Sequence, residues 1–179
     1  MIQMKSLLLI LAFLLLTVAV VFGQDKKSRK EAKKEKQRQE YMETKMLLDS
    51  GAFSFTATWA TTQKGRRINL IGNSNQLTLE DTLTSAYLPY FGVVQMYDMS
   101  GEGGINFEGT AQDLKIEHKD KKMRSMVSFE VKSSTGNEVY QCQFTINSNS
   151  SAALSVRSSA RNQISYDGTI APLPDEKKK

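Results

Sequence analysis

The sequence is short of the side chains on which most catalytic and metal sites depend. Its 179 residues include one cysteine, Cys142, and one histidine, His118. A lone cysteine excludes an intrachain disulfide, and one cysteine with one histidine cannot form a His/Cys metal cluster. The fold must therefore be stabilised by a packed core, for which a single domain of this length suffices.

Motifs for nucleophilic catalysis and for phosphate or calcium binding are missing as well. The chain contains no G-x-S-x-G, no G-x-x-x-x-G-K-[ST] and no D-x-[DN]-x-[DN]-G. We place Cys142 in the core, because it alternates with apolar residues, and His118 at the rim of a strand. These absences predict a protein without catalytic activity, cofactor or metal. A hydrolase that uses paired carboxylates is the weakest alternative, with candidates at Glu80, Asp81, Glu102, Glu108, Asp113 and Asp167.

A long apolar run occurs only near the N-terminus. Uncharged residues fill Leu7–Phe22, after Lys5, and charged sequence follows Gly23. This order is a charged start, an apolar run and small residues at a cleavage site. It predicts a signal peptide over residues 1–23, cleaved near Gly23/Gln24. Because the run is shorter than the roughly 20 residues of a transmembrane helix, we expect a periplasmic or secreted protein with no stable membrane anchor.

The globular part lacks the charge excess that a nucleic-acid site needs. Residues 1–50 hold ten of the 24 Lys/Arg residues and six of the 19 Asp/Glu residues. Residues 175–179 hold three more Lys/Arg and two more Asp/Glu. Residues 51–174 hold the remaining eleven of each and are neutral. The net charge of +5 therefore belongs to the tails, and no nucleic-acid partner is expected. A solvated tail explains the basic excess, and weak attraction to an anionic membrane surface is the functional alternative.

A charged helical segment is predicted over residues 24–50. It contains no proline and is rich in strong helix formers. Its first half, residues 24–40, is polar all round and predicts a solvated tether. Its second half, residues 41–50, is predicted to dock on the core, with Gly51 at the helix C-cap. The apolar residues available for docking are Tyr41, Met42, Met46, Leu47 and Leu48.

Residues 51–174 carry a period of two, which is typical of half-buried strands. Alternate residues from Phe53 to Trp59 are predicted to share a buried face, and Leu77, Leu79 and Leu83 are predicted to share another. Asp81 interrupts the second face and is expected at an exposed position or bulge. Five later strands with short polar connectors predict an antiparallel meander. The expected fold is all-β, an antiparallel barrel or sandwich of about eight to ten strands with one N-terminal helix, ahead of a charged tail at residues 175–179.

The segment Tyr87–Gly109 is rich in aromatic residues and glycine. A nucleotide loop is disfavoured, because strand-like sequence rather than a helix follows the glycines. A corner that closes one end of a barrel is favoured, since aromatic clusters are mostly core. A binding mouth beneath a glycine-rich flap is the functional alternative. In that alternative the ligand-binding residues are Tyr87, Tyr90, Phe91, Tyr97 and Phe107.

Four short blocks resemble an exported bacterial family, domain of unknown function 4251. They are Phe53–Ala57, Leu88–Gly92, Gly103–Gly109 and Ile164–Ile170, in order along the chain. The resemblance covers nearly the whole mature chain and implies export and a similar architecture. The family has no assigned activity. Asp81–Leu83 also resembles the short O-glycosylation acceptor motif of the bacterial group in which the family occurs, with Thr82 as the acceptor.

Together these observations predict a non-catalytic binding module for a small apolar ligand or lipid. The alternative is an envelope protein that binds another protein, or that serves as a structural module without a ligand.

Overall fold

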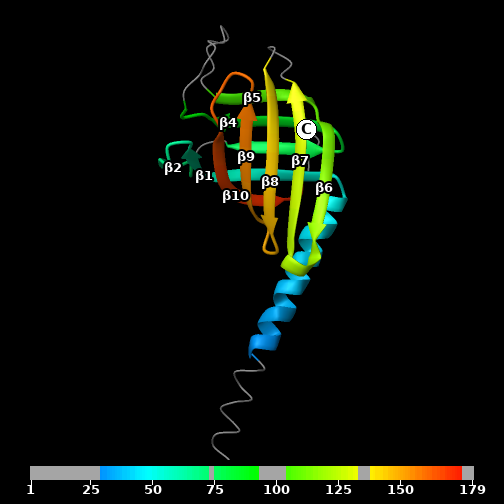
Figure 1. The fold of residues 1–179 in the computed structure, drawn as a ribbon. Helices are drawn as coiled ribbons and strands as arrows, with labels where there is room; N and C mark the ends of the chain where they lie inside the picture. The colour runs from blue at the N-terminus through cyan, green and yellow to red at the C-terminus, as the bar shows by residue number, and fades with distance from the viewer. Residues whose placement is uncertain (1–28, 73–74, 93–103, 133–137, 175–179) are drawn as a thin grey trace, which may run out of the picture. The chain divides into compact units, whose positions relative to one another are not determined.

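The part of the chain that the structure describes contains one helix and ten strands (Figure 1). The helix occupies residues 29–49, and a single 3-10 turn lies between two of the strands. The chain divides into two compact units, Met1–Gln39 and Glu40–Lys179. The prediction of an all-β fold with one N-terminal helix is confirmed. This computed structural model describes residues 29–72, 75–92, 104–132 and 138–174.

All pairings between the strands are antiparallel and belong to one sheet. In chain order the elements are β1 (Ala52–Thr62), β2 (Arg67–Asn69), β3 (Gln76–Glu80), β4 (Leu83–Pro89), β5 (Gly104–Thr110), β6 (Gln112–Lys119), η1 (Asp120–Lys122), β7 (Arg124–Lys132), β8 (Val139–Asn147), β9 (Ser151–Ser158) and β10 (Ile164–Ala171).

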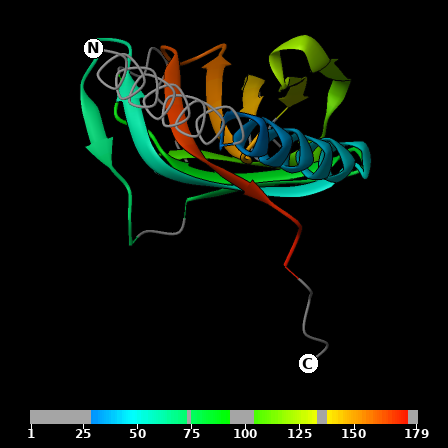
Figure 2. The same cartoon turned by 90° about the horizontal axis from the view of Figure 1, so that it is seen from below.

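The sheet curls into a nearly closed, barrel-like form, which Figure 2 shows from below. Its strand order is β5-β4-β3-β1-β10-β9-β8-β7-β6, and β2 pairs with β1 beside this path. Strands β6 to β10 are neighbours in both sequence and space, so the predicted five-strand meander is confirmed. The two ends of the sheet, β5 and β6, are joined in the chain by Ala111 alone, and β5 also packs on β7. The first and last strands of the order therefore approach each other.

The core consists of the inward-facing residues of the alternating strands, as the period of two predicts. Phe144 of β8 meets Phe53 and Phe55 of β1 edge to face, with ring centroids 5.9 and 5.3 Å apart. Phe107 of β5 packs on Tyr140 of β8 at 5.1 Å. Aromatic pairs at these separations add about 0.5–1.5 kcal/mol each beyond the area they bury. The interior between the two halves of the sheet is thus filled by aromatic and aliphatic side chains.

A β-bulge in β1 overturns the predicted orientation of Trp59. The pairing of β1 with β10 shifts between Ala57 and Trp59, so the alternation of side chains changes phase. Ala60 is fully buried, while Trp59 is only half-buried and lies under the guanidinium of Arg67, 4.7 Å from the ring centroid. The prediction that Trp59 shares the buried face of Phe53 was therefore wrong, because an extra residue in one strand moves every later side chain to the other face.

The predicted second face of leucines is divided by a turn. Asp81 adopts a left-handed conformation (φ 54°) at an exposed position between β3 and β4, where Asp is tolerated. Its predicted exposure is confirmed. Leu77 and Leu79 are buried, but Leu83 opens β4 on the outer side and is 63% exposed. Placing Leu83 with them was wrong, because the turn breaks the two-residue period.

The last turns of the helix pack on the sheet through one stripe. Tyr41, Thr44 and Leu48 are buried, and they recur at the three- and four-residue spacing of one helix face. Met42 and Met46 lie on another side and are 51% and 62% exposed. Gly51 has a left-handed φ of 71°, and its amide donates to the Leu48 carbonyl at 3.1 Å. The predicted C-cap is confirmed.

Candidate functional site

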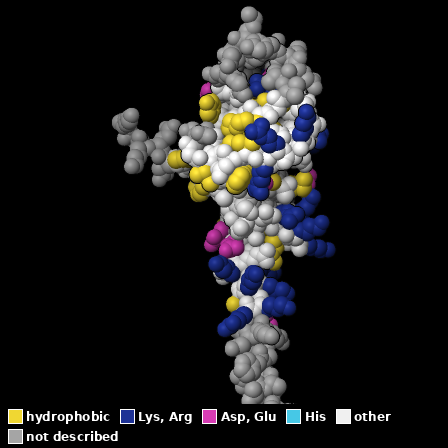
Figure 3. All heavy atoms as spheres, turned by 90° about the vertical axis from the view of Figure 1, so that its left-hand side faces the viewer, with side chains coloured by type: hydrophobic (Ala, Val, Ile, Leu, Met, Phe, Trp, Pro, Cys, Tyr) yellow, Lys and Arg dark blue, Asp and Glu magenta, His cyan; other side chains and the backbone are white. Residues whose placement is uncertain are grey.

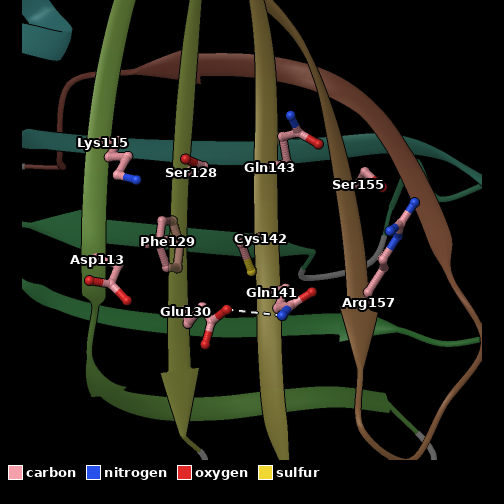
Figure 4. Close-up of a pocket in the computed structure, with 10 residues that line it drawn as sticks. All are labelled: Asp113, Lys115, Ser128, Phe129, Glu130, Gln141, Cys142, Gln143, Ser155 and Arg157. Carbon is pink, nitrogen blue, oxygen red and sulfur yellow. Dashed lines mark hydrogen bonds between the residues drawn. The ribbon is translucent and has the colours of Figure 1, made fainter.

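An open hollow of about 450 Å³ lies on the outer face of the sheet, over strands β6 to β9 (Figure 4). Phe129 and Cys142 are core residues, 3% and 2% exposed, so they contribute main-chain atoms to the floor. The other lining side chains are polar or charged and come from four adjacent strands. The lining residues are Asp113, Lys115, Ser128, Phe129, Glu130, Gln141, Cys142, Gln143, Ser155 and Arg157.

The strand register arranges the polar side chains in two rows. Directly paired residues form the first row, which runs Lys115, Ser128, Gln143 and Ser155 from β6 to β9. The second row lies two residues away along each strand. It runs Glu130, Gln141 and Arg157. Alternation puts the apolar partners of both rows in the core, so the outward rows are polar.

Hydrogen bonds hold several of these side chains in place. The amide of Gln141 donates to the Glu130 carboxylate at 2.9 Å. Outside the hollow, Gln163 accepts from the Arg157 guanidinium at 2.8 Å and donates to the Ser155 hydroxyl at 2.8 Å. Side chains on paired strands with fixed partners keep their geometry better than side chains on loops.

The charges that line the hollow are balanced. Asp113 and Glu130 carry two negative charges, and Lys115 and Arg157 carry two positive ones. Asp113 occupies a bulge in β6, where the pairing with β7 shifts between Gln112 and Lys115, and its φ is 52°. The hollow thus offers acceptors and donors without a net charge that selects an ion.

The four described aromatic residues among those predicted to bind a ligand do not lie on one surface. Tyr87 is on the outer side of β4 and is 60% exposed, and Phe91 is 42% exposed. Phe107 is 2% exposed and packs in the core against Tyr140. Tyr90 is 9% exposed, and Tyr97 lies outside the described residues. Among the described aromatics, Tyr87 and Phe91 are exposed, whereas Phe107 and Tyr90 are buried. These residues therefore do not line one shared site.

Tyr90 belongs to a buried polar cluster at one end of the sheet. Its hydroxyl donates to the Asn162 carbonyl at 3.0 Å, and the Arg161 guanidinium lies 5.4 Å from its ring centroid. Arg161 pairs with the Glu138 carboxylate at 3.1 Å, and both side chains are less than 10% exposed. Burial raises the pKa of the Tyr90 hydroxyl, whereas its bond to Asn162 and the positive charge of Arg161 act in the other direction. The Arg161–Glu138 pair is thus buried and hydrogen-bonded, and its geometry offsets part of the cost of removing both charges from water.

His118 joins the helix end to the sheet. Its Nε2 lies 2.8 Å from the Asp49 carboxylate, and its Nδ1 lies 2.8 Å from the Ser125 hydroxyl. Serine, histidine and aspartate in hydrogen-bonded series suggest a nucleophilic triad. However, Ser125 is 1% exposed, so its hydroxyl is shielded from solvent beside His118. The series is a structural connection between the helix, β6 and β7.

The other features singled out from the sequence are a lone cysteine, possible metal ligands and a threonine in a turn. Burial raises the pKa of the Cys142 thiol far above its usual value, which keeps it protonated and unreactive. The described stretches contain no group of three His, Cys, Asp or Glu side chains placed to hold a metal. They also contain no helix long and apolar enough to span a membrane. Thr82 lies exposed in the turn before β4, and its glycosylation stays a prediction.

The sequence prediction missed the hollow, although a signal for it was present. Gln141 and Gln143 alternate with buried residues on β8, as do Ser128 and Glu130 on β7. Each strand therefore has an outer row of amide, hydroxyl or charged side chains. Only the pairing register shows that these rows adjoin.

The sequence and the fold agree on one family. The profile of the domain of unknown function DUF4251 matches residues 35–170, most of the chain. The chain belongs to the DUF4251 family. The predicted resemblance is confirmed. A crystal structure of a DUF4251 family protein from Bacteroides eggerthii DSM 20697 has 18% sequence identity, and the alignment covers 74% of this chain and 87% of that one.

The TM-score between these two DUF4251 structures is 0.60. At this identity the likeness supports the fold alone. No curated protein matches the sequence.

Proposed function

We propose that this DUF4251 protein is an exported, non-catalytic binding module that holds a small polar ligand in the hollow over β6 to β9. The observation that carries the proposal is the pair of polar rows, which converge from four adjacent strands on one hollow. Convergent polar groups on a rigid scaffold are what orient a bound ligand.

Carbohydrate is the ligand class that fits these side chains. A sugar hydroxyl donates one hydrogen bond and accepts others, and side-chain amides such as Gln141 and Gln143 supply both kinds of partner. Carboxylates accept only and guanidinium groups donate only, so Glu130 and Arg157 extend the same pattern. The balanced charge of the hollow suits a neutral ligand.

The other expected functions have less support from the described residues. A small apolar ligand or lipid needs an apolar cavity, and the described aromatics expected to line it are divided between the core and the outer face. Binding without catalysis is consistent with the buried hydroxyl of Ser125 and the buried thiol of Cys142. Export rests on the apolar N-terminal run of the sequence. An envelope partner protein is the alternative to a ligand.

Isothermal titration calorimetry of the purified chain against a panel of neutral oligosaccharides tests the proposal. We expect saturable binding that Gln141→Ala weakens by about tenfold to a hundredfold, since removing a partner of a bound group costs about 1–3 kcal/mol. Gln76→Ala removes an equally exposed amide on β3 and should bind as the wild type does. If no neutral oligosaccharide binds, or if Gln76→Ala weakens binding as much as Gln141→Ala, the hollow is not the site.

A further inference from the structure

The described helix has a strongly basic stretch whose function the hollow does not explain. All eleven residues of 29–39 are exposed, and they belong to the unit Met1–Gln39. Two of them are acidic, Glu31 and Glu35, which leaves a net charge of +4. The six basic residues are Arg29, Lys30, Lys33, Lys34, Lys36 and Arg38.

The charges are arranged on different sides of the helix. Successive residues turn by about 100°, so Lys30, Lys33, Lys34 and Gln37 fall within one arc of about 100°. Arg29, Lys36 and Arg38 flank this arc. Glu35 lies on the opposite side of the helix, and Glu31 lies about 60° beyond Lys34, outside the arc. The arc from Lys30 to Gln37 therefore forms a basic face about 10 Å long.

We propose that this basic face, with Lys30, Lys33 and Lys34 at its centre, binds the anionic headgroups of a phospholipid membrane surface. Clusters of four to eight Lys and Arg residues on a helix are a recognised electrostatic match to such a surface, which contributes about 1 kcal/mol for each basic residue near it. The binding is independent of the ligand proposed for the hollow. Basic side chains along the described helix are visible in Figure 3.

The composition of the face favours a membrane surface over a protein partner. Protein interfaces have an apolar, often aromatic core, whereas the face contains only Lys and Gln side chains and is flanked by Lys and Arg. Its central charges are lysines, which are hydrated and mobile and do not impose the planar geometry of arginine. A flat array of diffuse negative charge meets these requirements. The absence of apolar side chains from the face predicts surface contact that salt weakens, rather than insertion.

Vesicle sedimentation tests this proposal. The full chain is purified with its N-terminus established by mass spectrometry, and every variant is prepared in the same form. The probes are vesicles of phosphatidylcholine alone and vesicles that also contain phosphatidylglycerol. The test variant is Lys30→Gln/Lys33→Gln/Lys34→Gln. Its control, Lys64→Gln/Lys121→Gln/Lys122→Gln, changes the net charge equally at exposed positions in the sheet-containing unit.

We expect the wild type to bind the anionic vesicles more tightly, and 0.5 M salt to remove the difference. The test variant should lose about a hundredfold in affinity for the anionic vesicles, from three lysines at about fivefold each, and the control should lose little. Equal affinity of the wild type for both vesicle types would overturn the proposal. So would equal losses in the two variants, or binding to soluble polyglutamate as tight as binding to anionic vesicles.

Discussion

At the scale of single residues, the close packing of β10 against β1 requires a glycine at position 168. Gly168 of β10 lies opposite Ala57, next to the bulge of β1. A methyl group on Gly168 would overlap the Thr56 carbonyl oxygen and come within 2.9 Å of the Phe55 ring. Because the Thr56 carbonyl oxygen is a backbone atom, it cannot move aside as the end of a flexible side chain could. Glycine is therefore required by close approach, not by an unusual backbone angle.

Gly168→Ala should lower the free energy of unfolding by about 1–3 kcal/mol or more, because the added methyl group overpacks a strand junction. Urea denaturation followed by circular dichroism measures the change. Ser165→Ala, at a half-buried position of the same strand, is the matched control and should change stability by less than about 0.5 kcal/mol. An unchanged midpoint in Gly168→Ala would mean that β1 and β10 are less closely packed than described.

At the scale of elements, the helix end is attached to the sheet by a small set of polar contacts. The Tyr41 hydroxyl donates to the Asp120 carboxylate at 2.8 Å, and the Lys45 ammonium lies 3.2 Å from the same oxygen. These hydrogen bonds hold the pKa of Asp120 below its usual value. Burial and the bond to Asp120 raise the pKa of Tyr41. These contacts attach the helix end to η1, and the Asp49–His118 contact attaches it to β6.

The lowered pKa of Asp120 makes this attachment sensitive to acid. A carboxyl whose folded pKa is depressed stabilises the fold above its unfolded pKa, and that contribution is lost as the pH falls through the folded pKa. Tyr41→Phe removes the largest cause of the shift. We therefore expect the variant to be less stable than the wild type at pH 7, and the difference to narrow below about pH 4.

Urea unfolding of both proteins between pH 7 and pH 3 measures this narrowing. Tyr87→Phe, at an exposed tyrosine on β4, is the control and should follow the wild type at every pH. A stability difference that is constant across the range would show that Tyr41 acts through packing alone and that Asp120 contributes nothing.

At the scale of the whole molecule, stability is expected to fall from the middle of the strand order toward its ends. β1 and β10 pair with neighbours on both sides, whereas β5 and β6 end the order and β2 has three residues. Local opening costs least where few backbone hydrogen bonds and buried contacts must be broken. The edge strands should therefore open before the centre.

Hydrogen exchange followed by mass spectrometry should show this gradient. We expect amides of β1, β10, β9 and β8 to exchange at least on the order of tenfold more slowly than those of β2 and β6. Equal protection of β6 and β10 would instead mean that the edge β6 is covered by a partner strand, for example in an oligomer.

The local alternation of the sequence determined the all-β class, most inward residues and the five-strand meander, because a period of two is a property of neighbouring residues. The Gly51 cap and the exposed turn at Asp81 followed from residue preferences of the same local kind. Alternation holds only while pairing is regular, so it failed at Trp59 and Leu83, where a bulge and a turn change the phase.

Only the tertiary structure decided which distant residues meet. The polar rows of the hollow, the contact of His118 with Asp49, and the separation of Tyr87 from Phe107 depend on strand register and on the curl of the sheet. These are set by pairings between segments far apart in the chain. The sequence predicts which face of a strand a residue occupies, whereas the tertiary structure determines which residues lie beside it.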